Sequence, residues 1–191
     1  LVGLSDAATR QAVIAGGGLR APNVVESLAE DVAAGIRADA GAADPQSVPR
    51  RALNTLQWEI PVNLPPFGPP GALTPEAHSF GRIFTGCFYD TVCDVFASQP
   101  TQDEQGLLAA AQIAGRLLIA AAQTAPEGAR FFQAVGRAMI LEDGVLSGGT
   151  HHSAIRDAFA GHQIAIGSTV MLAPTSGLAG APPTVDAATG R

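Results

Sequence analysis

Apolar residues recur at intervals of three or four positions along most of this chain, which is the period of a helix with one buried face. The strongest pattern follows a proline-rich segment and ends near Gln99. Its apolar face comprises Phe80, Phe84, Cys87, Phe88, Val92, Val95 and Phe96. Weaker patterns of the same period predict helices over residues 6–15, 23–41, 101–124, 126–147 and 150–159. The sequence therefore predicts a mainly α protein in which five or six helices pack together. The expected core side chains are Phe80, Phe84, Phe88, Phe96, Leu117 and Phe132.

Short polar residues and glycines mark the ends of these helices. The expected N-terminal caps are Ser5 or Asp6, Asn23, Thr101 and Thr150. A glutamate follows Asn23 and Thr101 by three residues, which is the spacing of a capping box. Glycine pairs or triplets stop the first helix after residue 15 and separate the last two.

Two segments depart from the helical pattern. Closely spaced prolines make residues 44–73 an extended excursion, because proline cannot continue a helix. Residues 168–191 form a tail rich in glycine, proline, alanine and serine, and loose alternation over 163–172 predicts a short strand. We therefore divide the chain into a helical lobe, residues 1–167, and an extended C-terminal tail.

The composition narrows the range of functions. Hydrophobic residues make up 47 % of the 191 residues and charged residues 15 %, which is typical of a globular protein. All eleven cations are arginine, so chemistry that needs a lysine amine is excluded. A net charge of −6 with dispersed arginines argues against a nucleic-acid partner, which needs a basic patch.

Neither a membrane span nor a disulfide framework is expected. The most apolar stretch, residues 107–122, contains Gln112 and Arg116 and is too short to cross a bilayer. No signal-peptide pattern is visible, and a first residue that is not methionine suggests that a segment precedes Leu1. Cys87 and Cys93 are six residues apart on different helix faces and are interpreted as buried thiols. They therefore do not indicate whether the protein works in an oxidising or a reducing compartment.

Histidines are the main candidates for chemistry, since the standard catalytic signatures are absent. His151 and His152 are adjacent at a helix start and point about 100° apart, so a solvated helix start is a better interpretation than a metal site. His78 precedes the long aromatic helix. An imidazole there could donate a hydrogen bond to a substrate oxyanion, or it could be structural.

A resemblance to a known family favours the catalytic alternative. The stretch His78-Ser-Phe-Gly-Arg-Ile-Phe-Thr-Gly-Cys-Phe-Tyr89 resembles the segment His-x-x-(Ser/Gly)-x-(Ile/Val)-(Ile/Phe)-x-x-Ala-x-(Tyr/Trp) of thermolysin-like zinc metallopeptidases, the gluzincins. The segment 49–54 resembles their Leu-Arg motif, and residues 134–163 resemble their last two helices. The resemblance implies that His78 stabilises the tetrahedral intermediate, and that Arg51, 27 residues upstream, holds the substrate carbonyl.

The chain also departs from the family. It lacks the His-Glu-x-x-His motif that supplies two zinc ligands and the general base. Glu26-Ser-Leu-Ala-Glu30 imitates the Glu-x-x-x-Asp motif of the third ligand, but with Glu in place of Asp and at a shorter interval, so a cap on a solvated helix face is a better interpretation of Glu26 than a metal ligand. The family's acidic partner of the histidine falls at Leu73, so Glu76 would have to replace it.

The sequence is thus interpreted as the C-terminal, substrate-side lobe of a thermolysin-like metallopeptidase homologue. The fragment itself is expected to hold no cofactor and to be inactive alone, while zinc is implied for the complete protein. Expected partners are a peptide substrate, the missing N-terminal zinc-binding half and, over the uncovered apolar face, a second copy of the chain in a homodimer. The alternative is a helical binding or structural module without catalysis.

Overall fold

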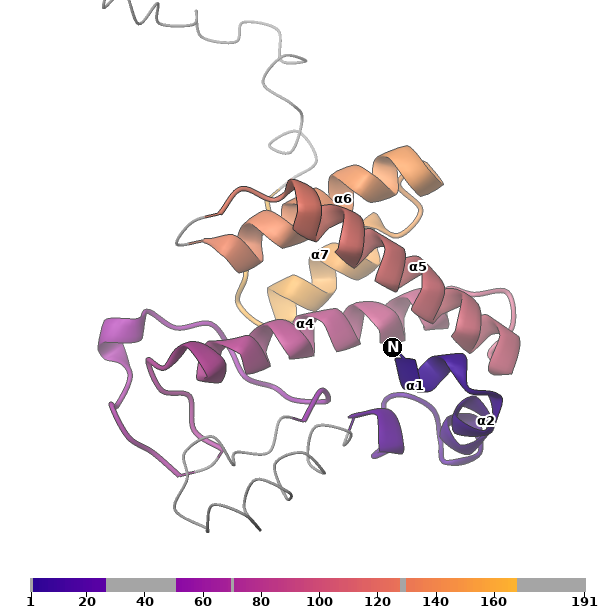
Figure 1. Ribbon diagram of the computed structural model, residues 1–191, viewed down its shortest axis with the longest axis horizontal. Coiled ribbons are helices and arrows are strands. Elements are labelled where there is room, and N and C mark those ends of the chain that lie inside the picture. The colour runs from indigo at the N-terminus through magenta and orange to yellow at the C-terminus, as the bar shows by residue number, and fades with distance from the viewer. Residues whose placement is uncertain (1, 27–50, 70, 128–129, 168–191) are drawn as a thin grey trace, which may run out of the picture.

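Helices α4 to α7 form the body of the structure, and two short helices, α1 and α2, lie against one end of it (Figure 1). The computed structural model describes residues 2–26, 51–69, 71–127 and 130–167. Its elements are α1 (Val2–Ser5), α2 (Ala7–Ala15), the 3-10 turn η2 (Pro61–Asn63), α4 (Ala77–Ala97), α5 (Glu104–Thr124), α6 (Phe131–Ser147) and α7 (His152–Gly161). Helices dominate these ranges and no strand occurs in them, so the predicted mainly α class is confirmed.

Several predicted segments fall wholly or partly outside these ranges. Residues 24–26 are helical, but the remainder of the helix predicted over 23–41 is not described. Of the proline-rich excursion, the described residues from 51 onward are irregular apart from η2. Residues 163–167 are not a strand, and the tail lies outside the described residues.

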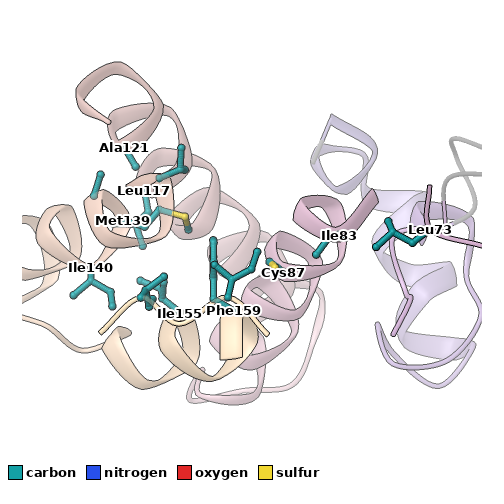
Figure 2. Close-up of a cluster of buried hydrophobic side chains, with 13 residues drawn as sticks. Leu73, Ile83, Cys87, Leu117, Ala121, Met139, Ile140, Ile155 and Phe159 are labelled. Atoms are coloured by element: carbon teal, nitrogen blue, oxygen red, sulfur yellow. The ribbon is translucent and has the colours of Figure 1, made fainter. Parts of the chain in front are cut away.

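Two clusters of buried side chains hold the helices together. One lies between α6, α7, the start of α4 and the end of α5; it includes Ile83, Leu117, Met139 and Phe159, and Figure 2 shows it with Leu73 at one side. The other lies where the end of α4 and the start of α5 meet α1 and α2. The start of one long helix thus shares a cluster with the end of the other, because α4 and α5 run antiparallel.

Only two of the six side chains that were expected in the core are buried. Phe96 and Leu117 are buried, whereas four phenylalanines are half-buried and pack at the edge of the first cluster: Phe80, Phe84, Phe88 and Phe132. Phe84 stacks on Phe132 at 5.1 Å between ring centroids and meets Phe159 edge-on at 5.9 Å. Phe80 and Phe132 are not fully covered because they line a pocket, described below.

The interpretation of the cysteines as buried thiols is confirmed. Both are free and buried, Cys87 in the first cluster and Cys93 in the second. Burial raises the pKa of each thiol to about 12, since a thiolate would lose its hydration there. Neither sulfur is therefore activated for chemistry.

The helix caps were predicted correctly at one end of the chain and wrongly further along. Asp6 caps α2, its Oδ2 accepting from Thr9 N at 2.7 Å. Asp103, not Thr101, caps α5, because its Oδ1 accepts from the amides of Gln105 and Gly106. Thr150 does not cap α7; its hydroxyl donates back to the Ser147 carbonyl.

The start of α6 also differs from the prediction. Pro126 was expected to begin this helix, which instead begins at Phe131. Ala125 has extended backbone, with ψ of 130°, as proline favours in the residue before it. Pro126 therefore ends α5 rather than starting α6.

Helix α5 is 21 residues long, with a mean hydropathy of 1.4 over its most apolar window, enough by length and composition to cross a membrane. The sequence analysis predicted no membrane span because it took only residues 107–122, a stretch shorter than the whole helix. Yet α5 packs against α1, α2, α4 and α6, and a face that includes Leu107, Ala110, Ala114 and Leu117 is buried. A core helix has the same properties, so α5 is only a weak indication of a membrane span.

Close packing at the start of α5 gives a stability prediction. A Cβ at Gly106 would lie 2.0 Å from the Thr101 carbonyl oxygen, whereas a Cβ at Gly81, in α4, would meet nothing within 4 Å. We expect Gly106→Ala to lower the free energy of unfolding by more than about 2 kcal/mol, because the backbone must move. Gly81→Ala, the matched control, should raise it by up to about 1 kcal/mol, because alanine loses less entropy in a helix. Urea unfolding followed by circular dichroism measures both, and equal effects would contradict the prediction.

Candidate functional site

Arg51 lies on an irregular segment that is tied to α4 near its start. The side-chain amide of Asn54 donates to the carbonyls of Arg51, at 2.8 Å, and of Arg82, at 3.1 Å. Arg82 lies one turn after His78 on α4, so the Arg51 segment runs beside the helix that carries His78. The Arg51 side chain is more than half exposed.

His78 occupies the first turn of α4, and its neighbours fix that turn. Glu76 is the N-cap, with its Oε2 accepting from Ser79 N at 3.1 Å, and Thr74 N donates to Ser79 Oγ at 2.9 Å. The side chain of His78 lies outside what the structure describes. Its pairing with Glu76, and its opening onto one face with Arg51, stay predictions.

Glu26 differs from its expected place on a solvated helix face. Its side chain is only 4 % exposed, and its Oε1 lies 4.0 Å from Arg51 Nη1. The Glu26 carbonyl accepts from Ala52 N at 3.1 Å, which attaches it directly to the Arg51 segment. The other carboxylate oxygen, Oε2, is buried without a hydrogen-bond partner among the described residues. The solvated interpretation is wrong because the Glu26 side chain is buried, with Oε1 facing an arginine 25 residues away in sequence.

The predicted cap before Glu26 is present. Asn23 Oδ1 accepts from the amides of Val25 and Glu26 at 2.9 and 3.1 Å. Asn23 Nδ2 donates to the Tyr89 hydroxyl, which donates to the Leu19 carbonyl. These bonds attach the turn that carries Glu26 to α4, so Glu26 is held between two parts of the structure.

The paired histidines at the start of α7 are not a solvated helix start. His151 is buried, and its backbone amide donates to Asp143 Oδ2 at 2.9 Å. His152 Nε2 lies 2.8 Å from the Ile140 carbonyl oxygen and therefore donates to it. Gly148 and Gly149, both with positive φ, turn the chain back so that these residues pack on α6. Within the described ranges, no group of three or more His, Cys, Asp or Glu side chains could hold a metal ion.

Sequence reasoning missed an ionic cluster centred on the buried ring of His162. This ring is 2 % exposed, with Nε2 3.2 Å from Asp90 Oδ2 and Nδ1 2.5 Å from the Leu56 carbonyl oxygen. Both neighbours are acceptors, an arrangement that favours the imidazolium form, in which both ring nitrogens can donate. Arg20 bridges Asp90 and Asp94 at 2.7 and 2.6 Å.

Burial alone would lower the pKa of His162, but the hydrogen bonds to Asp90 and Leu56 outweigh it and raise the pKa overall. Both ring nitrogens have partners and the ring is buried, so the geometry indicates a structural role for His162. The cluster joins the end of α7 to α4 and to the segment at Arg20.

The sequence contains one indication of this cluster, a glycine within α4. Gly86 interrupts the aromatic face of α4, and a Cβ there would lie 2.4 Å from His162 Cε1. A glycine inside a long helix indicates close approach of another group, but it does not say which group approaches.

Comparison with family models, with curated proteins and with solved structures finds no match to this chain. The site must therefore be interpreted from its own residues. They place a buried carboxylate beside an exposed arginine, next to α4, whose first turn contains His78.

Proposed function

We propose that this chain is the substrate-side helical lobe of a thermolysin-like zinc metallopeptidase, which acts together with a zinc-binding half that supplies His-Glu-x-x-His. The observation that carries the proposal is the Glu26–Arg51 pair, held by Asn54 and Ala52 beside the start of α4. This pair joins two of the segments whose sequences resemble that family.

Glu26 fits the one zinc ligand that such a lobe contributes. Buried carboxylate oxygens almost always have a hydrogen-bond or metal partner, and Glu26 Oε2 has none among the described residues. The described residues hold no complete ligand set, so the remaining ligands would come from the other half. When bound, zinc supplies Lewis-acid polarisation and an activated water.

Arg51 and His78 would act on the substrate. Arg51 is exposed and cationic, so its guanidinium can donate to the carbonyl of a peptide, with Glu26 Oε1 4.0 Å from its Nη1. An imidazole of His78, at the start of α4, can donate a hydrogen bond to the oxyanion that develops on the attacked carbonyl. Neither residue supplies a nucleophile, so this lobe is expected to be inactive alone.

The test begins with the coding sequence upstream of Leu1, which should contain His-Glu-x-x-His. The longer protein should hydrolyse an internally quenched peptide and bind one zinc per chain. Arg51→Met and His78→Phe should each lower kcat by about 10²-fold or more with zinc content unchanged. Glu26→Gln should lower the zinc content, measured by elemental analysis.

Arg116→Gln is the matched control, because Arg116 is an exposed arginine on α5. It should leave kcat and zinc content unchanged. An upstream sequence without the motif would contradict the proposal, as would Arg51→Met and His78→Phe enzymes that keep full activity. Either result would favour the helical binding or structural module.

A further inference from the structure

A pocket of about 680 Å³ opens where the Trp58 segment, the start of α4, the first turn of α6 and residues 163–165 meet. Aromatic side chains dominate its wall: Trp58, Phe80, Phe131 and Phe132. Its volume lies within the range of about 300–1,000 Å³ that is typical of small-molecule sites. Trp58 is 40 % exposed and Phe131 39 %, so much of this aromatic surface meets solvent.

Long-range contacts hold the walls in place. Trp58 N donates to the His162 carbonyl at 2.8 Å, and Gln133 Nε2 donates to the Ala165 carbonyl. Arg137 Nε donates to the Ile166 carbonyl at 3.2 Å, one turn further along α6. Hydrogen bonds therefore join three of the four parts of the chain that form the pocket: the Trp58 segment, α6 and residues 162–166.

One positive charge lies in this pocket. Arg130, just before α6, is the only ionisable residue among those that line it, and it forms no ion pair within the described ranges. Glu127 and Glu142 line a separate groove that Arg130 also borders, and neither lines the aromatic pocket. The peptide dipoles at the first turn of α6 add to the positive potential.

We propose that this pocket binds a small monocarboxylate with an apolar alkyl or aryl body. The body would cover the exposed rings of Trp58 and Phe131, and the carboxylate would pair with the Arg130 guanidinium. A second negative charge on the ligand would find no second cation among the residues that line the pocket, and an uncharged ligand would not use the Arg130 guanidinium. The proposal does not depend on the metallopeptidase assignment, because it concerns different residues.

The chain provides its own reporter, since Trp58 is its single tryptophan. Octanoate and 3-phenylpropanoate should each change the fluorescence of Trp58 in a saturable way. Octanoate should bind at least about fivefold more tightly than 1-octanol, the gain expected from one ion pair of about 1 kcal/mol. Arg130→Gln should remove this preference, and Phe131→Ala should weaken the binding of both compounds.

Arg116→Gln again serves as the matched control and should leave the octanoate affinity unchanged, and circular dichroism should show that every variant is folded. An absence of saturable change with either acid would overturn the proposal. So would equal affinity for octanoate and 1-octanol, or equal weakening by Arg116→Gln and Arg130→Gln. Because the readout is binding, failure here leaves the peptidase test unaffected.

Discussion

The free energy of unfolding is expected to decrease as the pH rises above 6.5, the ordinary pKa of histidine, because the raised pKa of His162 means that folding favours its imidazolium form. The pKa of His162 is raised in the folded protein, so its contribution is fully present below 6.5 and is lost as the pH passes the raised value. The groups that face the ring are Asp90, the Leu56 carbonyl and Gly86. Cys87 interacts with Asp90 but does not titrate here, since its pKa is about 12.

Urea unfolding measures this dependence between about pH 5.5 and about pH 8.5, roughly one unit below and two units above the ordinary pKa of histidine. Asp90→Asn leaves the imidazolium without its carboxylate and should lower stability at the acid end by about 3 kcal/mol while flattening the pH profile. Asp157→Asn is the control, because Asp157 is an exposed aspartate whose pair with Arg156 contributes little. A profile for Asp90→Asn that parallels the wild type would contradict the role of the pair.

Phe159→Ala should cost about 3–5 kcal/mol of unfolding free energy, the range for removing a buried aromatic side chain. Phe159 is fully buried in the first cluster and meets Phe84 edge-on. It also packs so closely on α6 that a Cβ at Gly136 would lie 2.7 Å from Phe159 Cε1. Neighbouring atoms therefore have little freedom to fill the cavity that alanine leaves.

Urea unfolding with an unchanged m-value measures the Phe159 effect cleanly. Phe67→Ala is the control, since Phe67 is 88 % exposed, and it should change stability by less than about 0.5 kcal/mol. A loss below about 1 kcal/mol for Phe159→Ala would mean that the first cluster can repack around the missing ring.

The helices could be predicted because their signals are local. The apolar face of α4 and the Asp6 and Gly16 boundaries of α2 each depend on residues a few positions apart. The cap of α5 was assigned wrongly because Thr101 and Asp103 are both suitable side chains, and only geometry decides which reaches the free amides.

The ionic contacts could not be predicted because their partners are distant in sequence. Asp90 and His162 are 72 residues apart, and neither lies in a recognisable motif. Glutamate is usually an exposed residue, so the burial of Glu26 and its approach to Arg51, 25 residues away, could not be predicted from the local pattern. The half-burial of Phe80 and Phe132 likewise follows from a pocket that no helical period describes.

The two cysteines lie in different core clusters, so their labelling rates can report local opening of the fold at two separate places. A thiol whose pKa is about 12 reacts with a maleimide only when the surrounding helices separate and admit water. The rate of modification at Cys87 therefore reports opening between α4, α6 and α7, and the rate at Cys93 reports detachment of α1 and α2. Peptide mapping after brief labelling would rank the two halves of the bundle by their local stability.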